Sequence, residues 1–162
     1  MSNSVKANSW LSHFQLAYTL TGAPPVIEWE VVADGEEIEF GMPVTKAANK
    51  VSEAVATSGA LYGVALSAGI AGDEIMVAVG DRNNVFVGEA DARTDTLNFP
   101  MECDIIKDGT KGFLVDIGAS VEDVCNVLGK VVDDDDTDTD DPGRVYFQIK
   151  RSQWDSIVAA QT

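Results

Sequence analysis

The sequence predicts an all-β fold: a small β-barrel or β-tulip-like domain with an N-terminal arm and a short C-terminal helix. Three observations support this prediction. Short apolar segments recur roughly every 8–12 residues from position 26 onward. Gly, Asp and Asn separate these segments, which is the turn composition of hairpins. Several segments alternate apolar and polar residues, and this is the period of a half-buried strand.

Residues 1–24 are interpreted as an N-terminal arm or as the first strand of the fold. Residues 13–20 alternate with the strand period, and Pro24-Pro25 interrupts the chain directly afterwards. A nearly neutral, aromatic segment is not expected to be a solvated tail. If it is an arm, it would add a strand to a neighbouring subunit. The candidate interface residues are Trp10, Leu11, Phe14, Leu16, Tyr18 and Leu20.

Residues 25–162 are predicted to form a single β-barrel-like domain. Pro43 places the segment 37–40 at an edge or bend. The segment 124–132 also fits a helix, but we favour a strand that pairs with 144–150 across an acidic loop, 133–143. The expected strands are 26–32, 37–40, 44–46, 51–56, 61–66, 74–79, 85–88, 101–106, 111–117, 124–132 and 144–150. Segments 61–89 and 101–117 are both interpreted as hairpins.

Two four-residue patterns match the capping box that begins helices. The first, at 120–123, predicts a helical turn. The second, at 152–155, predicts the start of a terminal helix in which Trp154, Ile157 and Val158 form an apolar stripe.

The charge balance of the 162 residues limits the possible partners. The chain has 27 acidic and 11 basic residues, a net charge of −16. Seven of the acidic residues lie in the run 133–141, and the remainder is still acidic, at 20 to 11. An acidic surface repels nucleic acid and anionic membranes and complements a basic protein surface. The chain also contains no apolar run of about 18 residues, and Ser12, His13 and Gln15 interrupt any signal-peptide core. We therefore expect no nucleic-acid or membrane partner.

Reactive side chains are few, so neither a catalytic function nor a cofactor is expected. The single histidine, His13, has no accompanying Ser or Cys signature. An enzyme would need a pocket that pairs His13 with a carboxylate. Cys103 and Cys125 form no CxxC pair. Buried free thiols are the simpler interpretation, and a disulfide stays open.

The acidic run 133–141 was compared with a calcium-binding loop. An EF-hand loop needs Gly at its sixth position and Glu at its twelfth. Counting from Asp133, these positions hold Asp138 and Arg144, so no EF-hand is present. Looser calcium ligation would use Asp134, Asp136, Asp138 and Asp140. The alternative function is therefore a free-standing acidic β-domain that binds calcium or carbohydrate through this loop. A solvated, self-repelling loop is the simpler interpretation.

Residues 41–90 carry a resemblance to a known family. The relevant stretches are 41–45 (GMPVT), 62–66 (YGVAL) and 71–77 (AGDEIMV). Together they resemble the small capsid decoration proteins of tailed bacteriophages, also called head-stabilisation or cement proteins. Residues 115–120 and 144–147 are similar in style to phage structural proteins. The resemblance covers about half of the chain.

The resemblance implies a structural virion protein without catalytic activity. Such a protein would be made in the host cytoplasm and would bind the outer surface of the capsid lattice, usually as a trimer. Its partner would be the major capsid protein. We expect residues 8–20 and the edge of the 61–89 hairpin to carry the interface.

Overall fold

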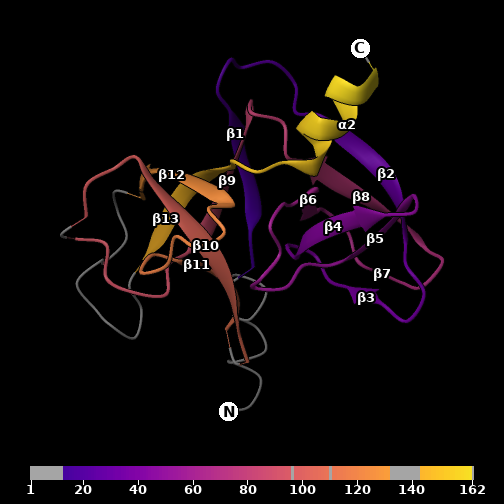
Figure 1. The fold of residues 1–162 in the computed structure, drawn as a ribbon, viewed down its shortest axis with the longest axis horizontal. Coiled ribbons are helices and arrows are strands. Elements are labelled where there is room, and N and C mark those ends of the chain that lie inside the picture. Colours follow the sequence, from indigo (N-terminus) through magenta and orange to yellow (C-terminus); the bar gives the residue numbers. More distant parts are fainter. Residues whose placement is uncertain (1–12, 96, 110, 132–142, 162) are drawn as a thin grey trace.

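Strands dominate the structure, and the prediction of an all-β barrel with a short C-terminal helix is confirmed. The computed structural model describes residues 13–95, 97–109, 111–131 and 143–161. Figure 1 shows two groups of strands side by side, with α2 next to the barrel. The elements are β1 (Gln15–Thr19), β2 (Ile27–Val32), β3 (Glu37–Ile38), β4 (Pro43–Ala47), β5 (Lys50–Glu53), β6 (Gly63–Ala65), β7 (Gly69–Ile70), β8 (Glu74–Val79), β9 (Asn84–Glu89), β10 (Met101–Asp108), β11 (Gly112–Asp116), β12 (Cys125–Lys130), β13 (Arg144–Ile149) and α2 (Gln153–Gln161).

The first group is a closed barrel with the strand order β2-β5-β4-β6-β8. β2 and β5 run parallel, and the other neighbouring pairs are antiparallel. Ala48 and Asn49 join β4 to β5 with φ values of 50° and 64°, as a two-residue type I′ turn requires. Pro43 is the first residue of β4, a position at which a strand tolerates the missing N–H. The segment 37–40 supplies β3, which pairs with β7 outside the barrel.

The second group is a six-stranded sheet with the order β1-β9-β13-β12-β10-β11. β12 is a strand and pairs antiparallel with β13, as predicted. β10 and β11 form the hairpin predicted for 101–117. The acidic run 133–141 connects β12 to β13 in sequence but lies outside the described residues.

The prediction of one hairpin over 61–89 is wrong. β6 and β8 are neighbours in the barrel, whereas β9 belongs to the six-stranded sheet. The chain changes sheet at 80–83, where the Gly80 amide donates to the Tyr62 carbonyl at 2.7 Å. The Asn84 side chain then donates to the carbonyls of Val26 and Val79, at 3.2 and 3.0 Å. These two side-chain bonds hold the first residue of β9 beside the end of β8, where the chain passes from the barrel to the sheet.

The helical turn predicted at 120–123 is also absent. The backbone amides of Val121, Glu122 and Asp123 donate to the Asp104 carboxylate instead, at 3.1, 2.9 and 2.8 Å. Asp123 has a φ of 54°, which lies outside the helical region. A distant carboxylate thus satisfies the amides that a helix would have left free at its first turn.

One apolar core runs through both groups of strands. Phe14 lies in it and meets Phe147 edge to face, with ring centroids 4.9 Å apart. Gly88 makes room for this contact, because a Cβ there would lie 2.4 Å from Cδ1 of Phe14. On the surface, Lys107 of β10 pairs with Glu53 of β5. The two sheets therefore share packing and an ion pair.

The terminal helix begins as predicted. The Ser152 hydroxyl accepts the amides of Trp154 and Asp155 at 3.1 and 3.3 Å. Trp154 packs edge to face on Tyr62, with centroids 6.2 Å apart. The Gln153 side chain accepts the Lys46 amide and donates to the Lys46 carbonyl, which ties α2 to β4. Within the described part of the chain, no helix has the length and apolarity to cross a membrane.

Candidate functional site

The six predicted interface residues have different environments. Trp10 and Leu11 lie outside the described residues. Phe14 is fully buried in the core of its own chain, so it is not available on the surface. Leu16 packs against the core, whereas Tyr18 and Leu20 are exposed, to 44% and 53%.

A bulge explains why the predicted alternation of 13–20 breaks. Leu16 pairs with Phe86 and Tyr18 pairs with Val85, so two steps along β1 match one step along β9. Such a bulge reverses which face the following side chains occupy. Tyr18 then meets Tyr146 edge to face, at 5.6 Å between centroids. The described part of the segment therefore pairs within its own chain as β1, and Tyr18 and Leu20 are its exposed apolar side chains.

Among the described residues, an exposed apolar surface that includes a tryptophan lies on β2, and it was missed from the sequence. Trp29 is 63% exposed and Ile27 is also exposed. Both residues lie on one face of β2, and Trp29 is opposite Met76 of β8. We call Ile27, Trp29 and Met76 the β2 face. A tryptophan this exposed on a closed barrel is a candidate for contact with another molecule.

The orientation of β2 is reversed relative to its sequence pattern. Alternating Ile, Glu, Trp and Glu would ordinarily bury the apolar residues. Instead Glu30 is buried and accepts the Tyr62 hydroxyl at 2.6 Å and Lys46 Nζ at 2.9 Å. Burial and the Glu30 carboxylate both raise the pKa of Tyr62. The partners lie 16 and 32 positions away, so no local signal in the sequence could reveal the reversal.

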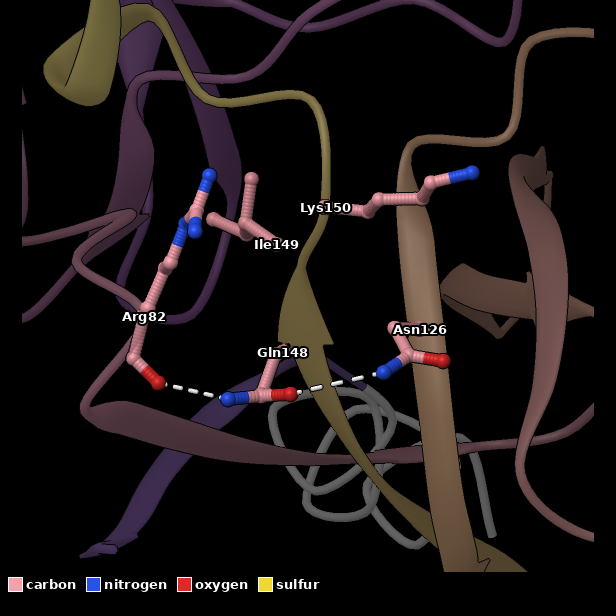
Figure 2. A pocket seen from close by; sticks show the side chains of 5 residues that line it. All are labelled: Arg82, Asn126, Gln148, Ile149 and Lys150. Atoms are coloured by element: carbon pink, nitrogen blue, oxygen red, sulfur yellow. Dashed lines mark hydrogen bonds between the residues drawn. The ribbon is translucent and has the colours of Figure 1, made fainter.

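A polar hollow of about 200 Å³ lies at the end of β13. Figure 2 shows the Gln148 amide at its base, donating to the Arg82 carbonyl at 2.5 Å and accepting from Asn126 at 3.4 Å. Its two cations already have acidic partners. Arg82 pairs with Asp155 at 3.4 Å, and Lys150 pairs with Glu102 at 2.5 Å. The positive charges that line the hollow are thus balanced by the carboxylates of Asp155 and Glu102.

His13 pairs with a carboxylate, the feature that an enzyme interpretation required. Its Nε2 lies 3.3 Å from Oε2 of Glu39, and its ring packs near Phe113. It borders a hollow of about 160 Å³ whose other lining residues are Gln15, Val87, Gly88 and Arg144. This lining has no hydroxyl, thiol or amine that the imidazole would activate. In the part of the chain that the structure describes, the arrangement is therefore a histidine–carboxylate pair whose hollow is lined by no nucleophile.

Carboxylates gather at the start of the β10–β11 hairpin. Asp104 and Asp116 are directly opposite each other, and Asp91 accepts the Ile117 amide at 2.8 Å. Burial raises the pKa of Asp116, and the charge and hydrogen bond of Asp91 add to this rise. Over the described ranges, no group of three or more His, Cys, Asp or Glu side chains is placed to hold a metal. The calcium candidates Asp134, Asp136, Asp138 and Asp140 lie outside those ranges.

Comparison with known proteins does not assign the chain. No protein-family model matches it, and no curated protein has a significantly similar sequence.

Proposed function

We propose that this chain is a non-catalytic structural protein of a virion, which binds the outer surface of a capsid lattice and stabilises the shell. The major capsid protein is the proposed partner, and a homotrimer is the proposed state. The protein would be made in the host cytoplasm and act on the virion. The observation that carries the proposal is the exposed β2 face on a closed barrel.

The β2 face is suited to protein contact because it is rigid and apolar. β2 is hydrogen-bonded on both sides, to β5 and β8. Its backbone is therefore already ordered and loses little conformational entropy when a partner binds. Tryptophan is among the residues that most often dominate binding energy at interfaces. Covering Trp29 and Ile27 would remove apolar surface from water that folding leaves exposed.

The charge of the chain supports a protein partner with a basic rim. The chain as a whole carries a net charge of −16 and therefore has a negative overall potential. Complementary charge at an interface raises the association rate and excludes wrong partners. A ligand that binds only the assembled lattice stabilises it by mass action, with no chemistry required. The same charge disfavours direct contact with packaged nucleic acid.

The test is co-sedimentation of purified protein with capsids that lack their decoration protein. Trp29→Ala should weaken binding by about thirtyfold, as expected for a loss of about 2 kcal/mol at an interface centre. Val121→Ala is the matched control, because Val121 is 82% exposed but lies in the 118–124 loop. It should bind like the wild type.

Two results would contradict different parts of the proposal. Absence of wild-type binding to any capsid lattice would reject the function. Binding that is equal for wild type and Trp29→Ala would reject the β2 face and leave the function standing. A deletion of 1–12 then tests the arm and keeps Phe14 in the core. It is preferable to a deletion of 1–20, which would remove β1.

A further inference from the structure

We propose that Cys103 and Cys125 form a latent cross-strand disulfide, which the folded protein accepts but which small oxidants cannot form in the folded state. This inference does not depend on the proposed function. It concerns two buried thiols, which have no role in the proposed contact surface.

The register of the six-stranded sheet places the two cysteines together. β10 pairs antiparallel with β12, and Cys103 is directly opposite Cys125. Residues directly opposite in such a pair have Cα atoms about 4.5 or 5.5 Å apart, depending on the hydrogen-bonding site. Disulfides span Cα separations of about 4.4–6.8 Å. The two side chains also lie on the same face of the sheet, as a bridge requires.

Both thiols are free and fully buried. Burial raises the pKa of Cys103 to about 12, and the charges of Asp116, Asp104 and Asp91 add to this rise. Burial also raises the pKa of Cys125 well above its ordinary value. Only the thiolate attacks a disulfide, so both groups react slowly at neutral pH. An oxidant must therefore reach them while β10 and β12 are apart.

The reaction needs an external oxidant, for which we specify a small-molecule disulfide. One cysteine thiolate attacks it, forms a mixed disulfide and releases one small thiol. The second cysteine thiolate attacks the protein sulfur of the mixed disulfide and releases the second small thiol. Overall, two protein thiols lose two electrons and two protons, and one small disulfide is reduced to two thiols. The new bond closes the segment 103–125 into a loop.

The bridge should stabilise the fold. It restricts the unfolded chain, and the register already places the two Cα atoms within the span of a disulfide. A loop of this size raises the unfolding midpoint by roughly 5–10 °C in a domain of this length.

The test compares two ways of adding oxidised glutathione to the full chain. In the first, the chain is refolded from denaturant in a mixture of oxidised and reduced glutathione. In the second, the folded protein is incubated in the same mixture. Alkylation followed by mass spectrometry counts the free thiols, and thermal unfolding gives the midpoint. Cys125→Ser is the control, and it should show no midpoint change on oxidation.

The expected result is an intramolecular disulfide after refolding, with the higher midpoint, and two free thiols in the protein that was never unfolded. Refolded protein that keeps both thiols free, or a bridged form with an unchanged or lower midpoint, would overturn the geometric inference. Rapid formation of the disulfide in the folded protein would overturn the inference that folding protects the two thiols from oxidised glutathione. If Cys125→Ser does not fold, Cys103→Ala serves as the control.

Discussion

Tyr62 donates its hydroxyl proton to Oε1 of the buried Glu30 at 2.6 Å, and this contact explains how β2 can expose a tryptophan and bury a glutamate. Lys46 Nζ completes the cluster at 2.9 Å from the same oxygen and lies 5.0 Å from the Tyr62 ring centroid. A buried carboxylate is tolerated only where it is paired and hydrogen-bonded. The polar cluster therefore fixes the orientation of β2 and with it the proposed contact surface.

Removal of the Tyr62 hydroxyl should destabilise the protein. Tyr62→Phe keeps the ring that packs on Trp154 but takes one donor from a buried carboxylate. We expect the free energy of unfolding to fall by about 1.5–3 kcal/mol, measured by urea denaturation. Tyr18→Phe, on the exposed surface, is the control and should change it by less than about 0.5 kcal/mol. Equal effects of the two variants would contradict the role of the cluster.

Asp104 should hold the 118–124 loop in place. Its carboxylate accepts three backbone amides, from Val121, Glu122 and Asp123. Asp104→Asn replaces one acceptor oxygen with a donor, so at least one of these backbone amides loses its partner. We expect these three amides to exchange hydrogen at least tenfold faster, as measured by NMR, which corresponds to about 1.4 kcal/mol.

The control for this prediction is Asp34→Asn, because the Asp34 side chain is 90% exposed. It should leave the exchange of the 121–123 amides unchanged. Protection of these amides that survives Asp104→Asn would show that other contacts hold the loop.

Gly88 should be intolerant of any side chain. A Cβ there would lie 2.4 and 2.8 Å from ring carbons of Phe14, inside van der Waals contact. Gly88→Ala should therefore cost about 1–3 kcal/mol of unfolding free energy, measured by denaturant titration. Gly118→Ala is the matched control, because nothing lies within 4 Å of its Cβ position. Adding Phe14→Leu to Gly88→Ala should cost less than the sum of the two single changes, and strict additivity would contradict the direct clash.

Asp116 should make the protein lose stability as the pH rises. Its pKa is raised in the folded state by burial and by Asp91 and Asp104, so the folded protein holds a proton that the unfolded chain releases. This contribution is complete below the ordinary aspartate pKa and is lost as the pH rises through the folded-state value.

Asp116→Asn removes this titration and keeps a group that can donate to Asp91. The unfolding free energy of the variant relative to wild type should increase between acidic and neutral pH, measured by urea denaturation at a series of pH values. A difference that stays constant across this range would contradict the assignment to Asp116. The opposite slope is expected from Asp95 and Glu102, whose pKa values are lowered by hydrogen bonds to Arg93 and Lys150. Both are present in wild type and variant, so they cancel in the comparison.

Local patterns predicted those elements whose stabilising contacts are near in sequence. β12 and β13 have the expected alternation, and Ser152 begins α2 through bonds to residues two and three positions away. The capping box at 120–123 failed for the opposite reason, because its amides donate to the carboxylate of Asp104, which lies 17 to 19 positions away. The same applies to β9, which leaves the barrel and pairs with β1 and β13, two strands far from it in sequence.

The candidate surface depended almost entirely on distant contacts. Tyr18 and Leu20 were identified from composition, but the bulge that exposes Tyr18 arises only when β1 pairs with β9. Trp29 was missed, because its strand reads as ordinary alternation until Tyr62 and Lys46 reach Glu30.

By itself, the sequence determined that the chain is all-β, that it is strongly acidic and that it ends in a short helix, because strand period, charge and a helix cap are local properties. Only the tertiary structure decided which face of β2 meets solvent, where the chain passes from barrel to sheet, and that Cys103 lies opposite Cys125. Register and burial come from pairing between strands far apart in sequence. The free energy of burying or exposing a side chain is therefore set by partners that no local pattern contains.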